Sequence, residues 1–206
     1  MSRGLLIAFE GGDGSGKSTQ AAIAAERLGA VLTRQSGGTP FGEKLRSILL
    51  DPASADLSLR AEALLFMADR AEHVQKVVEP ALADGFHVVS DRWAYSSFVY
   101  QGYGRGLDVA ELRQLSDWSM QGLWPDLVVF LDIPLETGVN RVDVRNETRD
   151  HFELAGAGLQ QRVVGGYRDL AAADPERWRV VDGTDSVEEV AERVWSVIEA
   201  ALAARN

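Results

Sequence analysis

Short apolar runs alternate with longer amphipathic stretches along the chain. Five apolar runs are predicted to form β-strands, at residues 4–10, 30–34, 86–91, 127–132 and 178–182. Between them, apolar residues recur at helical spacing, which predicts helices at 19–28, 40–50, 58–84, 107–121, 134–146, 152–172 and 186–204. Because the strands are continuously apolar, they are typical of a parallel sheet that is covered on both faces. The pattern therefore predicts an α/β protein with a doubly wound, five-stranded parallel sheet.

Two of the predicted helices have features of their own. In the last helix, Val190, Val194 and Ile198 are spaced to form one apolar face, so we interpret it as a packing helix without a site. Pro80 falls inside the stretch 58–84 and lacks the backbone N–H that a continuous helix needs. That stretch is therefore expected to be either one kinked helix or two helices.

A glycine-rich segment directly follows the first predicted strand and precedes a helix. Its letters GGDGSGKS, residues 11–18, fit the pattern G-x-x-x-x-G-K-[ST]. In this context the pattern is that of a P-loop, whose backbone N–H groups bind a polyphosphate beside a helix N-terminus. Lys17 is expected to reach the β- and γ-phosphates of ATP, and Ser18 to hold Mg²⁺. The predicted ATP-binding residues are Gly11, Gly12, Asp13, Gly14, Ser15, Gly16, Lys17, Ser18 and Thr19.

Composition limits the remaining possibilities. A chain of 206 residues is long enough for one core, and we expect a single domain over 1–206. The formal net charge of −10 argues against nucleic acid or an anionic membrane as the main partner. The chain has no cysteine, which excludes disulfides, and its first apolar run is too short for a signal or membrane segment. We therefore expect a cytoplasmic protein.

Charged residues follow the other predicted strands at their carboxyl ends. Arg34 ends the second strand, and Asp91 and Arg92 end the third. Arginine at two such ends suggests a second anionic group beside the triphosphate, because a guanidinium matches phosphate oxygens in pairs. Asp91 is placed to act on Mg²⁺ or its bound waters. The alternative is that Asp91 and Arg92 pair with each other.

Two further groups lie on predicted helices. Phe66 and Arg70 are four residues apart and so share a helix face, where they could stack on a planar base and bond its carbonyl edge. Arg141, Arg145 and Arg149 also recur every four residues. They form either a solvated surface or a lid, approximately 141–153, that brings positive charge to a transferring phosphoryl group.

Taken together, these motifs resemble the bacterial thymidylate kinases over nearly the whole chain. FEGGDGSGKSTQ resembles the P-loop of that family, and TRQSGGTPFGEKLR is similar to its TREPGGT…GE…R segment. EALLFMADRAEH resembles its second helix, DRWAYSSFVYQGYGRGL its D-R-(Y/H)-x-x-S…A-Y-Q-G…R-G segment, and PDLVVFLD its fourth strand. The resemblance implies a P-loop fold with a short lid and transfer of a phosphoryl group from ATP to dTMP.

The resemblance also implies roles for individual residues. Phe66 would stack on thymine and Arg70 would bond its O4, while Tyr100 would exclude ribonucleotides at the sugar 2′ position. Asp13 would lie near the 3′-hydroxyl or the metal. The implied substrate-binding residues are Asp13, Arg34, Arg46, Phe66, Arg70, Arg92, Ser96, Ser97, Tyr100 and Gln101, of which Arg34, Arg46 and Arg92 would hold the dTMP phosphate. The implied catalytic residues are Lys17, Arg92, Arg145 and Arg149, and the implied metal ligands are Ser18 and Asp91.

The chain departs from the family pattern at three places. Gln35 and Ser36 replace the usual Glu-Pro, which removes a charge beside the acceptor site and loosens a turn. Gly14 stands where one subclass has arginine, so the chain is similar to the subclass with lid arginines. His151 replaces an expected lid arginine and is its only titratable substitute nearby. These departures leave the reaction class in place and bear on the rate and on the preference for dTMP.

The sequence therefore predicts a dTMP kinase that uses ATP and Mg²⁺ and forms a homodimer. Two alternatives remain open at this point. One is a kinase for another acceptor, such as dUMP, a 5-modified dUMP or a deoxynucleoside. The other is an ATPase switch, although the fourth strand ends without a guanine-reading N-K-x-D motif and Arg92 follows Asp91 where many ATPases have glutamate.

Overall fold

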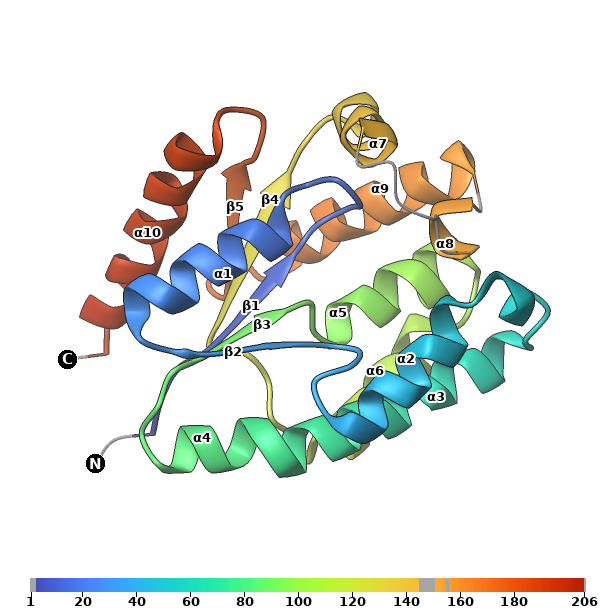
Figure 1. Ribbon diagram of the computed structural model, residues 1–206, viewed down its shortest axis with the longest axis horizontal. Helices are drawn as coiled ribbons and strands as arrows, with labels where there is room; N and C mark the ends of the chain where they lie inside the picture. Colours follow the sequence, from blue (N-terminus) through green and yellow to red (C-terminus); the bar gives the residue numbers. More distant parts are fainter. Residues whose placement is uncertain (1–2, 145–150, 155, 206) are drawn as a thin grey trace.

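A five-stranded parallel sheet forms the centre of the computed structural model, which describes residues 3–144, 151–154 and 156–205 (Figure 1). The strands are β1 (Leu6–Glu10), β2 (Val31–Arg34), β3 (Val88–Asp91), β4 (Leu127–Asp132) and β5 (Trp178–Asp182). Their order in the sheet is β2-β3-β1-β4-β5, and every neighbouring pair is parallel. The predicted fold class is confirmed, and each predicted strand forms with bounds that differ by at most two residues.

Helices connect these strands and cover both faces of the sheet. Those of the described residues are α1 (Lys17–Leu28), α2 (Pro40–Leu50), α3 (Leu59–His73), α4 (Glu79–Ala83), α5 (Ala94–Ser97), α6 (Val109–Met120), α7 (Leu135–Val144), α8 (His151–Leu154), α9 (Ala157–Ala173) and α10 (Val187–Ala203). A 3₁₀ turn spans Pro52–Ser54, and π-helical segments span Val74–Val78 and Phe98–Gly104. None of the helices in these ranges has the length and apolar composition needed to cross a membrane.

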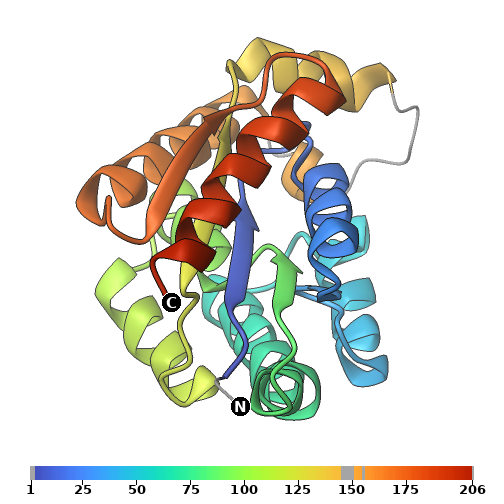
Figure 2. The ribbon, with the colours of Figure 1, turned by 90° about the vertical axis from the view of Figure 1, so that its left-hand side faces the viewer.

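The alternation of side chains along β1 divides the core into two layers. Leu5, Ile7 and Phe9 pack against α1 and α10 on one face, whereas Leu6 and Ala8 pack on the other face in a cluster that includes residues of α3, α6 and α9. From the side, α1 and α9 lie on opposite sides of the sheet (Figure 2). Because successive strand residues point to opposite faces, the acidic residue that ends β1 continues the second face.

Two predicted helices are divided in the structure, and one helical segment was not predicted. The stretch 58–84 forms α3 and α4 with a π-helical segment between them, and Pro80 lies in the first turn of α4, where its missing N–H leaves no bond unmade. The stretch 152–172 forms α8 and α9, because Gly156 has a φ of 86° at the start of α9. Residues 94–104, for which no helix was predicted, form α5 and a π-helical segment.

The strand register brings the candidate residues to one edge of the sheet. Phe9 at the end of β1 and Arg34 at the end of β2 both lie opposite Asp91 of β3. The carboxyl ends of three adjacent strands therefore meet beside the P-loop, which is where ligands bind in open α/β sheets.

Candidate active site

The P-loop forms a tight turn between β1 and α1. Gly16 has a φ of 86° at the N-cap of α1, and no side chain caps this end of the helix, so its N–H groups face the loop. Gly14 touches α7: a Cβ atom there would lie 2.3 Å from the backbone oxygen of Gly138. The turn thus presents backbone donors and the positive end of a helix, the combination that binds phosphate.

Lys17 lies across this loop with little exposure to solvent. Its Nζ is 3.3 Å from the Gly12 carbonyl oxygen and 4.0 Å from Asp13 Oδ1, and the residue is 8% exposed. Burial, together with the positive charge of Arg92, lowers the pKa of the Lys17 ammonium to about 8. A phosphate bound in the loop would counteract the effects of burial and of Arg92, and would therefore raise the pKa of Lys17 and stabilise its charged form.

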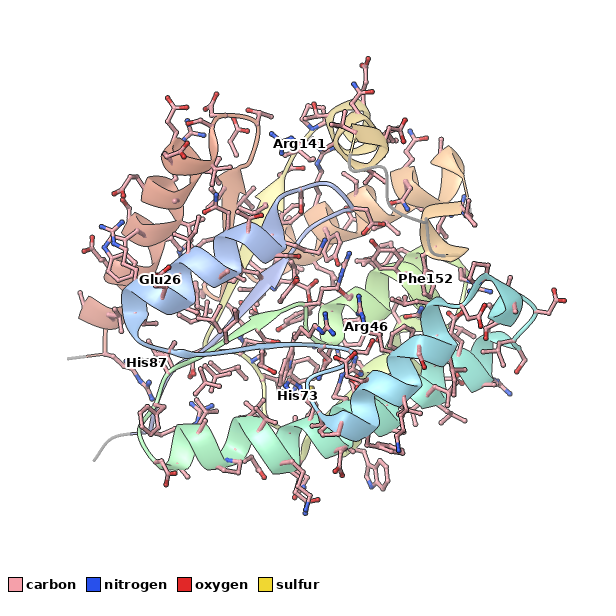
Figure 3. All side chains as sticks on the ribbon, viewed as in Figure 1. Glu26, Arg46, His73, His87, Arg141 and Phe152 are labelled. Atoms are coloured by element: carbon pink, nitrogen blue, oxygen red, sulfur yellow. The ribbon has the colours of Figure 1, made fainter. Side chains whose placement is uncertain are left out.

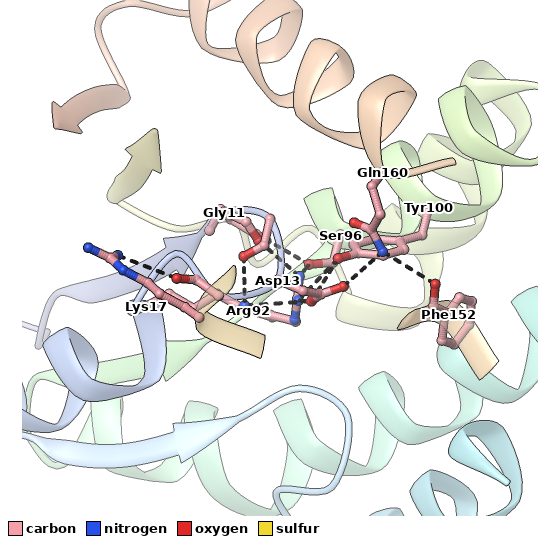
Figure 4. Close-up of polar contacts among 12 residues, drawn as sticks. Gly11, Asp13, Lys17, Arg92, Ser96, Tyr100, Phe152 and Gln160 are labelled. Carbon is pink, nitrogen blue, oxygen red and sulfur yellow. Dashed lines mark hydrogen bonds and ion pairs between the residues drawn. The ribbon is translucent and has the colours of Figure 1, made fainter. Parts of the chain in front are cut away.

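Arg92, at the carboxyl end of β3, is held in a single orientation by several side chains (Figure 4). Its Nη2 donates to Asp13 Oδ1 at 2.7 Å and to the Tyr100 hydroxyl at 3.2 Å, and its Nη1 donates to Ser96 Oγ and Tyr167 Oη at 3.1 Å each. The backbone of Arg92 has a φ of 68°, a conformation uncommon for a residue with a side chain. The alternative pairing of Arg92 with its neighbour in sequence is wrong, because its carboxylate partner is Asp13.

Glu10 anchors this arrangement from the end of β1. The residue is fully buried, and its carboxylate accepts bonds from the Trp93 N–H at 2.8 Å, Ser96 Oγ at 2.7 Å and Tyr167 Oη at 2.8 Å. Burial raises the pKa of Glu10, while Arg92 and these hydrogen bonds oppose the shift. The pKa of Asp13 is lowered overall. Burial raises it, but the positive charges of Arg92 and Lys17 together outweigh that effect, so the carboxyl stays ionised.

Two more arginines face the same region, from the end of β2 and from α2. Arg34 pairs with Glu43, and Arg46 donates to the Ser36 carbonyl oxygen at 3.2 Å. Burial, with the charges of Arg34 and Arg92, lowers the pKa of Arg46. Three guanidinium groups that repel one another in one place form a site that a phosphate dianion stabilises.

A cavity of about 310 Å³ joins the P-loop to these arginines. All ten substrate-binding residues implied by the sequence line it, together with Gly14, Lys17, Ser18 and Asp91. Arg46 on α2 and Phe152 on α8, both labelled in Figure 3, are among the residues that line it. Oδ1 of Asp91 is buried and has no hydrogen-bond partner within the described part of the chain. The remaining predicted ATP-binding residues form the turn before α1 and the first turn of that helix.

The far end of the cavity is suited to a planar base. Phe66 lies at its wall, with its ring centroid 6.2 Å from that of Phe152. Arg70 is 1% exposed and donates from Nη2 to Ser97 Oγ at 3.0 Å. Gln101 is 1% exposed as well, and its amide donates to Glu62 at 2.9 Å. The cavity therefore has a basic end that is suited to bind phosphate and an aromatic end with fixed hydrogen-bonding groups.

Comparison with known proteins agrees with this geometry. A family model described as thymidylate kinase matches residues 9–194. The chain belongs to the thymidylate kinase family. A thymidylate kinase of Oleidesulfovibrio alaskensis is 45% identical over 205 residues, covering 94% of this chain and 97% of the relative. One of Neisseria gonorrhoeae is 44% identical over 199 residues, covering 94% and 96%.

A solved structure supports the same assignment. The crystal structure of thymidylate kinase from Ehrlichia chaffeensis matches with a TM-score of 0.79 at 32% identity, covering 96% of this chain and 99% of the other. The predictions of a dTMP kinase and of an ATP-dependent phosphotransferase are confirmed, and the comparisons give no support to another acceptor or to an ATPase switch.

For this member of the thymidylate kinase family, the structure adds residues that the sequence patterns did not indicate. Glu10 and Tyr167 hold Arg92, and Phe152 packs against both Phe66 and Tyr100, with a centroid distance of 5.7 Å to Tyr100. The only available signal was a polar residue, Glu10, at the end of an apolar strand. The rest arises from contacts between distant parts of the chain.

The predicted lid arginines have different outcomes. Arg141 is half-buried, and its guanidinium donates to the carbonyl oxygens of Gly14 at 3.4 Å, Gly183 at 3.0 Å and Thr184 at 3.2 Å. It thereby joins the P-loop to the loop after β5. Arg145 and Arg149 lie outside the described residues, as does the side chain of His151. Their roles stay predictions.

Proposed function

We propose that the chain transfers the γ-phosphoryl group of ATP to the 5′-phosphate of dTMP, giving ADP and dTDP, with the residue roles set out below. The observation that carries this proposal is a single cavity lined by the P-loop residue Lys17 at one end and by Phe66 and Arg70 at the other. The arginines between them, above all Arg92, lie where the acceptor phosphate must meet the donor phosphate.

The reaction requires no nucleophilic side chain. An oxygen of the dTMP phosphate is ionised at neutral pH and forms the new bond to the γ-phosphorus, while the bond from that phosphorus to the bridging oxygen of ADP breaks. Lys17 would neutralise charge on the β- and γ-phosphates, and Arg34, Arg46 and Arg92 would hold the acceptor phosphate in line. Catalysis would then consist of positioning and charge neutralisation, with Arg145 and Arg149 expected to contribute from the lid.

Mg²⁺ fits the residues on the donor side. Ser18 and Asp91 both line the cavity, and the buried Oδ1 of Asp91 has no partner in the described ranges. One carboxylate and one hydroxyl are a suitable protein contribution for Mg²⁺, which otherwise keeps water and phosphate oxygens as ligands. When bound, it would supply positive charge to the donor phosphates; Ser18 and Asp91 would hold it there.

The base and sugar would bind at the opposite end. Phe66 would stack on thymine, Arg70 would donate to its O4, and Ser97 and Gln101 would meet the base edge. The ring of Tyr100 is 7% exposed, and its hydroxyl donates to Asp13 at 3.0 Å, so the ring would form a rigid wall for the 2′ position of the sugar.

We propose further that the chain acts as a single kinase domain over 1–206 with a lid at about 141–153, in the cytoplasm, as a homodimer. Support for the dimer comes from α3 and α6, which pack against each other and carry Leu64, Leu115 and Trp118 on their outer faces. Trp118 is 80% exposed, an unusual position for a large aromatic residue on a lone subunit.

A coupled assay of ADP release tests this function. Purified protein is given ATP and Mg²⁺ with dTMP, dUMP, UMP, dCMP, dGMP, thymidine or water alone. We expect ADP release to depend strongly on dTMP. A preference for another acceptor would refute the substrate assignment, and release that is independent of any acceptor would refute the kinase.

A further inference from the structure

Arg70 is a buried cation whose hydrogen-bond partners are all uncharged. Its Nε donates to Gln35 Oε1 at 2.9 Å, its Nη1 to Met67 Sδ at 2.9 Å and Ser116 Oγ at 3.1 Å, and its Nη2 to Ser97 Oγ at 3.0 Å. Buried guanidinium groups are normally paired with carboxylates, because an uncompensated buried charge is costly. Burial accordingly lowers the pKa of Arg70 to about 10, although it remains charged at neutral pH.

Gln35 connects this cation to a buried histidine. A guanidinium only donates hydrogen bonds, so the oxygen of the Gln35 amide must face Arg70 and the nitrogen must face the other way. Nε2 of Gln35 is 3.5 Å from Nδ1 of His73, and Nε2 of that ring is 2.6 Å from Thr33 Oγ1. Arg70 therefore donates to Gln35, Gln35 donates to Nδ1 of His73, and His73 donates to Thr33. In this arrangement His73 carries its proton on Nε2.

His73 is neutral in this arrangement. It is fully buried, and burial together with the neighbouring Arg70 lowers its pKa to about 4. His73, labelled in Figure 3, packs against Gly38 and does not line the cavity. A ligand in the cavity would therefore not contact His73, and the protonation state of this histidine reports on the charge at position 35.

A glutamate at position 35 would have nearly the same shape as Gln35 but a different electrostatic effect. Its carboxylate would pair with Arg70 and would accept a hydrogen bond from a charged His73, whereas the Gln35 amide donates one to a neutral His73. The neutral amide adds no negative charge beside Arg70, whose guanidinium charge is offset only in part by the nearby Asp69 and Glu10; neither carboxylate is among its hydrogen-bond partners above. Four of its five N–H donors are used by the bonds above, and within the described chain one N–H of Nη2 is left for a ligand.

We propose that Gln35 is a specificity-determining residue: by holding Arg70 through a neutral oxygen, it leaves the guanidinium charge to the nucleotide base and strengthens selection for a strong acceptor at C4 of the pyrimidine. This inference rests on the proposed placement of the base against Phe66 and Arg70. The ligand class is a pyrimidine deoxynucleotide with a 4-carbonyl, and an analogue with a poorer acceptor at that atom is penalised.

A cycle of two nucleotides and two proteins tests the coupling between residue 35 and O4. Dissociation constants of dTMP and 4-thio-dTMP, in which sulfur is a weak acceptor, are measured by calorimetry on the wild-type protein and on Gln35→Glu. We expect the wild-type protein to bind dTMP about tenfold more tightly than 4-thio-dTMP, because bonds to charged donors are the stronger ones. In Gln35→Glu the ratio should fall to about twofold.

Two variants serve as controls. Gln35→Met is similar in size and neutral, so it should weaken both nucleotides alike and keep the wild-type ratio. Gln161→Glu adds the same charge at an exposed position of α9 that does not line the cavity, and should behave as wild type. An unchanged ratio in Gln35→Glu, or the same loss of ratio in Gln35→Met, overturns the inference.

The imidazole of His73 gives a readout that does not depend on turnover. Nitrogen chemical shifts of the wild-type protein should place the His73 proton on Nε2 and show no protonation down to pH about 5, and Gln35→Glu should raise the His73 pKa. A proton on Nδ1 in the wild type would reverse the donor chain and overturn the inference. Tight dTMP binding without phosphorylation would instead refute the proposed function alone, and absence of dTMP binding would refute both.

Discussion

The hydroxyl of Tyr167 donates a 2.8 Å hydrogen bond to the carboxylate of Glu10, which joins α9 to the end of β1 beside Arg92. The same hydroxyl accepts a 3.1 Å bond from Arg92. Because both residues are fully buried, this contact is shielded from water and from salt. The orientation of Arg92 therefore depends on a tyrosine that does not line the cavity.

Replacement of Tyr167 by phenylalanine should loosen Arg92 without emptying the core. The ring keeps its stacking on Phe130, at a centroid distance of 5.4 Å, while Glu10 and Arg92 each lose one bond. We expect KM for dTMP to rise about tenfold, KM for ATP to change little, and the free energy of unfolding to fall by about 2 kcal/mol. Steady-state kinetics and denaturant titration measure both.

Tyr95→Phe is the matched control for that change. Tyr95 is also a buried tyrosine, but its hydroxyl bonds Arg177 at 3.4 Å on the side away from the cavity. Its KM for dTMP should be that of the wild type. Equal kinetic effects of the two substitutions would show that Tyr167 acts only through general stability.

The pKa of Lys17 predicts opposite effects of pH on activity and on stability. Only the ammonium form binds phosphate, so kcat/KM for ATP in the free enzyme should fall as pH rises through about 8. The ordinary pKa is 10.5, so between pH 8 and 10.5 the unfolded chain holds more protons at this residue than the folded one. The contribution of Lys17 to stability should therefore rise over the same interval.

Lys17→Met isolates these effects from other titrating groups. The variant should lose kcat by a factor on the order of 10² to 10³, because charge on the transferring phosphoryl group is no longer neutralised. The difference in unfolding free energy between wild type and variant, measured at pH 7 and pH 10, should favour the wild type more at pH 10. A near-normal kcat in the variant would contradict the phosphate role.

Tyr100→Ala should improve use of the ribonucleotide counterpart of dTMP relative to dTMP itself, because it removes the ring that we propose faces the 2′ side of the sugar. Tyr100→Phe keeps the ring and loses only the bonds to Asp13 and Arg92, so its selectivity should stay close to wild type while KM rises. Competition between the two nucleotides measures the ratio directly. An unchanged preference in the alanine variant would remove Tyr100 from the sugar site.

Arg141→Ala should act on the donor side. Loss of the bonds to Gly14, Gly183 and Thr184 separates the P-loop from the loop after β5, so we expect KM for ATP to rise about fivefold and KM for dTMP to stay constant. Arg193→Ala removes a second guanidinium bonded to the same region, at the Asp182 carbonyl oxygen and Asp185, and should leave both constants unchanged. A rise in KM for dTMP would point to a lid function instead.

The fold and much of the site could be predicted because the relevant signals are local. Apolar runs and glycine spacing identify β1 and the P-loop, and a four-residue spacing places Phe66 and Arg70 on one helix face. The Glu10–Tyr167 contact could not be predicted in this way, since it joins residues from opposite ends of the chain. Gln35 could be recognised as a departure, but its bonds to Arg70 and His73 depend on how α3 packs against the β2–α2 connection.

Boundaries failed where one residue changed the local geometry. Gly156 interrupts the stretch 152–172 because it adopts a left-handed φ, which apolar spacing does not register. Residues 94–104 are helical although their sequence places Ser96, Ser97 and Gln101 among apolar positions; these polar groups are satisfied by Glu10, Arg70 and Glu62, all distant in sequence.

The contact between Gly14 and Gly138 limits how this protein can vary. A Cβ atom on Gly138 would lie 2.6 Å from the backbone oxygen of Asp13, just as one on Gly14 would overlap the backbone of Gly138. Each glycine is thus excluded from change by main-chain atoms, which no substitution at the other position can remove. A clash between side chains can be relieved by a second mutation, but a clash with the main chain cannot. The P-loop and α7 can therefore accept a larger residue at either glycine only if the two backbones move apart.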